Sequence, residues 1–282
     1  MTKRVCAIIS DYNGTLYPAS NSKSKDAIPK ELEIILSEIA DHIPVCILSR
    51  NDYESLGGRV PFANIVSCIL GIETIVFDRT KTKKGCKVKT RHLLLERDIL
   101  HRRGYALNQL ARDVGIKFPG IETVRRFTYD GLLASITFDW RNHKEYRRNY
   151  WIITQYVKEK VSTMPRDCSS SPFLQTYDSY PFLDVHAAQC DKGFGFDRII
   201  AEMDDYSKGP ILYLGDSEND NPAFRKADIS IGVSSSKKSP KLDCQYLIEY
   251  NHLSRFLRRL QDNDFEFHKE LLTGSSFRVD SV

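Results

Sequence analysis

The stretch CAIISDYNGTLYPAS, residues 6–20, joins a short apolar run to a polar loop. The run carries Asp11 into a loop that contains Gly14, Thr15 and Pro18. A carboxylate at the end of a strand is typical of a phosphoryl-transfer nucleophile, because it can attack phosphorus and form an aspartyl-phosphate. Two residues later, where a second carboxylate could act as an acid, the sequence has Asn13. The stretch therefore raises the question of whether this is a phosphate-processing enzyme with one catalytic group altered.

Two further apolar runs end in polar residues. The run 43–49 ends in Ser49 and is followed by Arg50, and the run 210–215 is followed by Asp216. Such continuous runs are typical of strands that a parallel sheet buries on both faces. Ligands bind outside the carboxyl ends of the strands in an open parallel sheet, so we expect these residues to share an edge with Asp11. Lys192 precedes a predicted helix, whose N-terminal N–H groups also favour an anion.

The order of predicted elements indicates an α/β fold with an insertion. Residues 4–78 show a β-α-β-β pattern, and an α/β pattern resumes after residue 190. We therefore expect a Rossmann-like parallel-sheet core, residues 1–78 and 185–282, and an inserted α+β domain, residues 79–184. In the insertion we expect a turn-rich boundary at 78–92, a helix at 92–115 ended by Gly115, a hairpin around Asp130-Gly131, a second helix at 146–161 and a strand at 182–189. Residues 168–172 are expected to form a loop, and residues 273–282 a frayed tail.

Charge is distributed unevenly along the chain. The formal net charge is only +4, but residues 79–178 contain 21 Lys and Arg against 10 Asp and Glu, a balance of +11. The rest of the chain has a balance of −7. A basic middle between acidic flanks favours separate modules, one of which could attract anions; an ordinary solvated surface explains the charge equally well.

The composition excludes several classes of protein. No apolar run reaches the roughly 18 residues needed to span a bilayer. The seven cysteines form no C-x-x-C pair, which favours a reduced, cytoplasmic protein over a disulfide scaffold or a zinc cluster. The aromatic residues of RRNYWIITQY, residues 147–156, fit the core of the insertion better than a base-stacking platform. We therefore expect neither a nucleic acid nor a membrane as partner, and the sequence leaves the oligomeric state open.

The polar residues at the predicted sheet edge suit a single chemical task. Asp11, Asp216 and Asp220 offer hard oxygen ligands, which suit Mg²⁺. Phosphoryl oxygens could be held by the hydroxyls of Thr15 and Ser49, by the backbone of Gly14 and by the ammonium group of Lys192. Each signal is weak alone, because a strand-terminal Asp is most often a turn former.

Together these residues resemble a known family. DYNGTL (11–16), ILS (47–49), DKG (191–193) and GDSENDNPAF (215–224) resemble the four ordered motifs of the haloacid dehalogenase superfamily of phosphatases. The insertion after the second motif looks like the α/β cap domain of the branch that holds sugar-phosphate phosphatases, such as those for mannosyl-3-phosphoglycerate and sucrose phosphate. FLDVHAAQCDKGFGFDRII, residues 182–200, is especially similar to that branch. The resemblance implies Mg²⁺-dependent hydrolysis of a small phosphorylated metabolite.

The resemblance also implies roles for single residues. Asp11 would be the nucleophile and a Mg²⁺ ligand, and position 13 would lend its backbone carbonyl to the metal. Asp216 would bind the metal, Asp220 would do so directly or through water, and Asn219 would help to order the loop. Ser49 and Lys192 would grip the transferring phosphate. Arg50 and Asn51 follow Ser49 and are expected to contact substrate; a second anionic group could be read by three arginines of the insertion, Arg125, Arg126 and Arg141.

Asn13 departs from the pattern of the family's hydrolases, which usually have Asp there. Asparagine keeps the carbonyl but has no proton to donate, and general acid–base help is worth roughly 10²–10⁴-fold. Four explanations remain open: an engineered trap, a natural variant that uses a good leaving group or another acid, deamidation of Asn13-Gly14 to Asp, or a protein that only binds phosphate. Transfer of phosphate to another acceptor is a weaker alternative, because no second acceptor site is marked.

Overall fold

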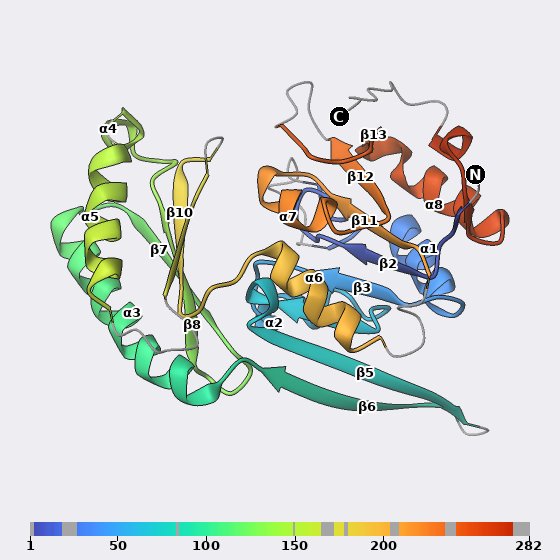
Figure 1. Ribbon diagram of the computed structural model, residues 1–282, viewed down its shortest axis with the longest axis horizontal. Helices are drawn as coiled ribbons and strands as arrows, with labels where there is room; N and C mark the ends of the chain where they lie inside the picture. Colours follow the sequence, from blue (N-terminus) through green and yellow to red (C-terminus); the bar gives the residue numbers. More distant parts are fainter. Residues whose placement is uncertain are drawn as a thin grey trace. The chain divides into compact units, whose positions relative to one another are not determined.

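The computed structural model describes residues 3–18, 27–82, 85–148, 150–164, 172–177, 180–203, 209–234 and 241–272. The chain divides into two compact units (Figure 1). The first unit comprises Met1–Arg50, Glu54–Leu93 and Asp191–Val282, and the second comprises Asn51–Tyr53 and Leu94–Cys190. The predicted α/β fold is confirmed. The loop and tail expected at residues 168–171 and 273–282 lie outside the described residues.

The unit boundaries differ from the predicted positions 79 and 184. Strands β5 (Glu73–Thr82) and β6 (Gly85–Leu94) extend the sheet of the first unit, so residues 79–93 belong to that unit. The Lys-rich composition of this stretch suggested turns, but charged side chains are also common on edge strands, where they face solvent. Residues 185–190 belong to the second unit, because β10 (Phe182–His186) pairs within its sheet.

An eight-stranded sheet forms the centre of the first unit in the described part of the chain. Its order is β13-β12-β11-β2-β3-β4-β5-β6. The strands from β13 to β4 pair in parallel, whereas β5 runs antiparallel to β4. Their bounds are Ala7–Ser10 for β2, Val45–Leu48 for β3, Ile65–Cys68 for β4, Ile211–Gly215 for β11, Ile229–Ser234 for β12 and Tyr246–Glu249 for β13. A small separate pair joins β1 (Lys3–Arg4) to β14 (Glu266–Phe267).

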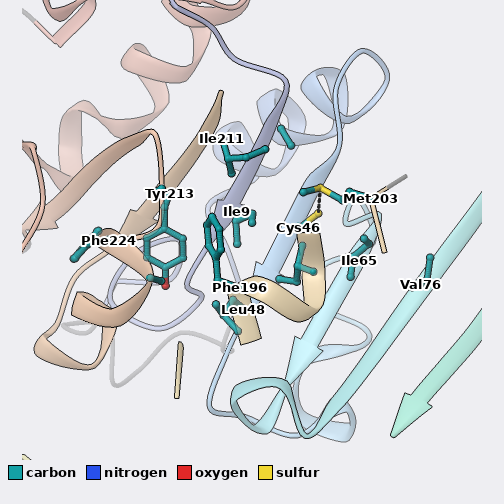
Figure 2. Close-up of a cluster of buried hydrophobic side chains, with 14 residues drawn as sticks. Ile9, Cys46, Leu48, Ile65, Val76, Phe196, Met203, Ile211, Tyr213 and Phe224 are labelled. Atoms are coloured by element: carbon teal, nitrogen blue, oxygen red, sulfur yellow. Dashed lines mark hydrogen bonds between the residues drawn. The ribbon is translucent and has the colours of Figure 1, made fainter. Parts of the chain in front are cut away.

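Helices cover the two faces of this sheet, as the continuous apolar strands require (Figure 1). α1 (Lys30–Ala40) packs beside α8 (Leu253–Asp262). α6 (Lys192–Ala201) and α7 (Asn221–Phe224) form a second pair of neighbouring helices in the same unit. The short α2 (Tyr53–Leu56) follows the third strand. Figure 2 shows the apolar cluster beneath α6, in which Phe196 packs with Ile9, Cys46 and Tyr213.

The second unit is a four-stranded antiparallel sheet with helices. The sheet order is β7-β8-β10-β9, and α3 (Arg97–Lys117) packs on β8. The remaining bounds are Glu122–Phe127 for β7, Leu133–Asp139 for β8, Phe173–Thr176 for β9, Lys144–Arg148 for α4 and Tyr150–Ser162 for α5. The predicted hairpin, helices and returning strand are present. The prediction for Gly115 is wrong: the helix begins at Arg97 and continues through Gly115 to Lys117, because a single glycine costs a helix only about 1 kcal/mol.

Within the described ranges, no helix combines the length and the apolar character that crossing a bilayer demands.

Candidate active site

The ends of three adjacent parallel strands bring the predicted site residues together. Strand β2 lies between β11 and β3, with Ser10 opposite both Leu214 and Ile47. Asp11, Ser49 and Asp216 follow these three strands, so they lie at one edge of the sheet. The Asp11 N–H donates to the Leu214 carbonyl (2.9 Å), and the Ser49 N–H donates to the Ser67 carbonyl (2.9 Å). These backbone hydrogen bonds continue the ladders and fix where the two side chains begin.

A buried ammonium group joins two of the carboxylates. Lys192 Nζ lies 2.7 Å from Asp11 Oδ1 and 2.5 Å from Asp220 Oδ1. Lys192 is only 1% exposed, although it stands at the start of α6. The preceding Asp191 caps this helix by accepting a hydrogen bond from the Phe194 N–H (2.7 Å). The cap fixes the first turn of α6, and this turn directs Lys192 toward the carboxylates.

The three carboxylates are close enough to share one cation. Asp11, Asp216 and Asp220 each offer an oxygen, and these oxygens all lie within 4.8 Å of one another. Oxygen donors of this kind are the ligands that Mg²⁺ prefers. Like charges this close oppose ionisation unless a proton or a cation compensates them. The residues therefore fit a divalent cation, with Asp11, Asp216 and Asp220 as the side chains that could hold it.

The pKa values of the cluster show the same shortage of positive charge. Burial raises the pKa of Asp11 to about 6, although the charge of Lys192 opposes the shift. Burial, together with the charges of Asp11 and Asp220, raises the pKa of Asp216 to about 9. Burial alone would lower the pKa of Lys192, but the charges of Asp11 and Asp220 raise it. At neutral pH the cluster therefore holds a charged Lys192 and retains a proton on Asp216.

The loop after Asp11 depends on a glycine. Gly14 has φ +86°, and a Cβ atom at this position would lie 2.0 Å from Asp216 Oδ2. Both the backbone conformation and the space therefore exclude a larger residue. The neighbouring Thr15 is buried, and its Oγ1 donates to Asp216 Oδ1 (3.3 Å). Gly14 and Thr15 thus pack directly against the second carboxylate of the site.

The other predicted residues are neighbours of site residues along the chain. Asn13 is exposed and forms a β-bridge with Tyr17. Arg50 and Asn51 are half-buried and directly follow Ser49; Asn51 groups with the second unit. Asn219 is half-buried and accepts a hydrogen bond from Ser217 Oγ (2.7 Å), which orders the loop after Asp216.

The three arginines of the insertion bond within the second unit. Arg126 is buried and its Nη1 donates to Thr137 Oγ1 (2.5 Å). Arg141 pairs with Asp139 at 2.7 Å, and Arg125 Nε donates to Asn108 Oδ1 (3.3 Å). These contacts give each arginine a structural partner in its own unit. Binding of a second anionic group by these arginines stays a hypothesis. For the buried Arg126, the hydrogen bond to Thr137 is a sufficient structural reason for an arginine at this position.

Sequence analysis did not single out two residues that contact Asp220. The Tyr213 hydroxyl donates to Asp220 Oδ1 (2.5 Å), and the Ser217 Oγ and N–H donate to Oδ2 (3.1 and 3.0 Å). Ser217 lies inside the GDSEND motif, so its place in that motif was a usable signal. Tyr213 lies within the apolar run of β11, where an aromatic side chain is ordinarily part of the core.

Comparisons with known proteins concern the family and the fold of the chain. A model of the haloacid dehalogenase-like hydrolase family matches residues 138–254. No curated protein sequence matches the chain. Solved structures that share the fold include the three described next. The C-terminal domain of trehalose-6-phosphate phosphatase from C. albicans is 14% identical with a TM-score of 0.68, covering 93% of this chain and 94% of that one.

The other two are a trehalose-6-phosphate phosphatase related protein and a sugar phosphatase of haloacid dehalogenase subclass IIB. The first is 15% identical with a TM-score of 0.59, covering 91% of this chain and 97% of that one. The second is 14% identical with a TM-score of 0.52, covering 92% and 99%. Together, the family match and the shared fold confirm the resemblance to the haloacid dehalogenase superfamily that the four motifs indicate.

Proposed function

We propose that the chain is a Mg²⁺-dependent phosphatase that acts on a small phosphorylated metabolite through Asp11. The observation that supports this proposal most directly is the position of Lys192 Nζ, 2.7 Å from the Asp11 carboxylate and within a cluster of three carboxylates. Structural ion pairs seldom bury two carboxylates on one ammonium group with a third carboxylate beside them, because burial of charge is costly. A cluster with strongly perturbed pKa values is more typical of a catalytic site.

The residues suit an in-line displacement in two steps. A carboxylate oxygen of Asp11 attacks phosphorus, a phosphorus–oxygen bond forms, and the bond to the leaving alkoxide breaks. With a pKa of about 6, Asp11 is mostly ionised at neutral pH and can attack. Water then attacks the aspartyl-phosphate, releases inorganic phosphate and restores the Asp11 carboxylate. Lys192 and the Ser49 hydroxyl would hold phosphoryl oxygens during both steps.

Mg²⁺ bound by Asp11, Asp216, Asp220 and the Asn13 backbone carbonyl would supply positive charge where the phosphoryl oxygens become more negative. The raised pKa of Asp216 fits this proposal, because a proton occupies a carboxylate that would hold the cation. Gly14 and Thr15 pack against the same carboxylate, and Asn219 orders the loop that carries it. Arg50 and Asn51 are proposed to contact the substrate from the loop after Ser49.

The proposed substrate class is a sugar phosphate. Support comes from neighbours of the same fold, whose names describe trehalose-6-phosphate phosphatases and a sugar phosphatase. The second unit would serve as the cap domain. A cytoplasmic location agrees with the free thiols of five cysteines, which are Cys6, Cys46, Cys68, Cys190 and Cys244.

Asn13 supports a second candidate function, which is binding of a phosphorylated metabolite without turnover. The side chain at this position cannot protonate a leaving alkoxide, since an amide has no titratable proton. It is exposed, however, and the remaining groups of the proposed chemistry are in place. Slow hydrolysis is therefore the primary proposal, and binding alone is the alternative.

Phosphate release from a panel of sugar phosphates, measured with Mg²⁺ and with EDTA, separates the two candidates. The wild type is compared with Asn13→Asp, Asp11→Ala and the double variant, and the mass of each intact protein is checked at residue 13. Asn13→Asp should raise turnover by about 10²–10⁴-fold, because it restores an acid. Asp11→Ala should abolish turnover in either background.

The alternative function predicts a different result. Thermal stabilisation by a sugar phosphate without phosphate release, even in Asn13→Asp, would favour a binding protein. A wild-type rate that Asn13→Asp does not raise would place the acid function elsewhere. Turnover that persists in Asp11→Ala would refute the proposed nucleophile.

A further inference from the structure

Tyr213 has an apolar ring and a polar end in different surroundings. Its ring packs edge-on against Phe196 and Phe224, with centroids 6.2 and 5.3 Å away. Figure 2 shows the ring between these two residues, with its oxygen at the far end from the strand. The residue is fully buried, and the hydroxyl donates to Asp220 Oδ1 at 2.5 Å. A buried phenol is costly without an acceptor, so this hydrogen bond fixes the ring and the carboxylate together.

Protein donors contact both carboxylate oxygens of Asp220. Oδ1 accepts from the Tyr213 hydroxyl and from Lys192 Nζ, both at 2.5 Å. Oδ2 accepts from the N–H groups of Asp216 (3.1 Å) and Ser217 (3.0 Å) and from Ser217 Oγ (3.1 Å). Five donor contacts therefore converge on this carboxylate. Asp220 is therefore held in one orientation, facing Lys192.

Lys192 divides its ammonium group between two carboxylates. Its Nζ is 2.7 Å from Asp11 Oδ1, only slightly farther than from Asp220 Oδ1. A cation and a phosphorus atom would both need the Asp11 carboxylate, so Lys192 competes with them for Asp11. The more firmly Asp220 holds the Lys192 ammonium group, the less this group competes with a cation for the Asp11 carboxylate.

We propose that Tyr213 is a positioning residue, whose hydroxyl holds Asp220 on Lys192 and thereby keeps Asp11 available to the cation. This inference rests on the proposed function, because it concerns the same carboxylates. Without the phenol, Oδ1 of Asp220 is no longer fixed beside Lys192, and the carboxylate can turn away from the ammonium group. Lys192 then pairs more closely with Asp11 and competes better with a divalent cation.

The test measures Mg²⁺ binding directly and requires no turnover. Mg²⁺ is titrated into wild type and Tyr213→Phe, which keeps the ring, and the dissociation constant is obtained by calorimetry. The dissociation constant should rise about tenfold, as expected for loss of a hydrogen bond to a charged group. Tyr146→Phe is the matched control, since its hydroxyl donates to the Pro119 carbonyl (3.3 Å) in the second unit. This control should leave Mg²⁺ binding unchanged.

The same substitution in a Lys192→Met protein tests whether the effect of Tyr213 on Mg²⁺ binding depends on Lys192. In Lys192→Met the competing ammonium group is absent, so adding Tyr213→Phe should change the dissociation constant by less than about twofold. If Tyr213→Phe does not fold, Ser217→Ala replaces it, because this variant removes a donor from Oδ2 of the same carboxylate. An unchanged dissociation constant in the single variant, or a tenfold effect that persists without Lys192, overturns the inference. Absence of Mg²⁺ binding by the wild type overturns the proposed function as well.

Discussion

Lys192→Met removes the buried positive charge from the carboxylate cluster and keeps a side chain of similar length. Lys192 Nζ contacts Asp11 Oδ1 at 2.7 Å and Asp220 Oδ1 at 2.5 Å, and both carboxylates are buried. The variant leaves these carboxylates without their ammonium partner in a site that excludes most water. We expect the first unit to lose stability, because an uncompensated buried charge is worse than either a pair or an apolar substitute.

The expected loss in the free energy of unfolding is about 3–5 kcal/mol, the range for breaking one side of a buried ion pair. Lys226→Met is the matched control. Lys226 pairs with Asp197 in the same unit, but both side chains are more than a third exposed. Such surface pairs contribute at most about 1 kcal/mol, so the same substitution there should have a small effect.

Urea unfolding at pH 7.5 without Mg²⁺, followed by far-UV circular dichroism, measures the loss. Tryptophan fluorescence reports separately on the second unit, because Trp140 and Trp151 both lie there. The difference from wild type should shrink below the Asp11 pKa of about 6, where the protonated Asp11 carboxyl group needs no ammonium partner. A loss at pH 7.5 no larger than that of Lys226→Met would refute the reasoning.

Two further predictions concern the carboxylates themselves. In the metal-free protein the raised pKa values of Asp11, about 6, and Asp216, about 9, contribute stability that is full below about pH 4 and is lost as pH rises through both values. Because Mg²⁺ would replace these protons, it should raise the melting temperature more at about pH 8.5 than at about pH 5.5, and an equal gain at both would contradict the proposed site. Gly14→Ala should remove stabilisation by Mg²⁺, since its Cβ would lie 2.0 Å from Asp216 Oδ2. Gly131→Ala has a similar φ of +82° but open space, so it should cost about 1–2 kcal/mol of stability and leave Mg²⁺ stabilisation intact.

The fold could be predicted where the sequence pattern reflects burial on both faces of a strand. The apolar runs that end at Ser10, Leu48 and Gly215 became the central parallel strands, and their order along the chain located the site edge. The pattern failed at the edge of the sheet. The edge strand β6 and its neighbour β5 carry many charged residues, and strands at the edge of a sheet need no continuous apolar run.

The candidate site could be predicted as a set of residues but not as a set of contacts. Strand-end position brought Asp11 and Asp216 to the same edge, and the motif order added Lys192 and Asp220. The role of Tyr213 could not be predicted, because a tyrosine in an apolar strand usually serves the core. Only the structure shows that its ring belongs to the core while its hydroxyl reaches a carboxylate.

Asn13 and the buried cluster bear on different parts of the proposed reaction. The cluster concerns binding and attack on phosphorus. Its buried charges lower the stability of the fold, and folding alone does not require such charges. The Asn13 side chain concerns only the proton that a leaving alkoxide needs, and the residue is exposed, so solvent can reach that position. An amide there therefore weakens departure of a poor leaving group without disturbing Asp11 or Lys192. For this reason the substitution argues for a slower phosphatase before it argues for a protein that has lost phosphoryl transfer altogether.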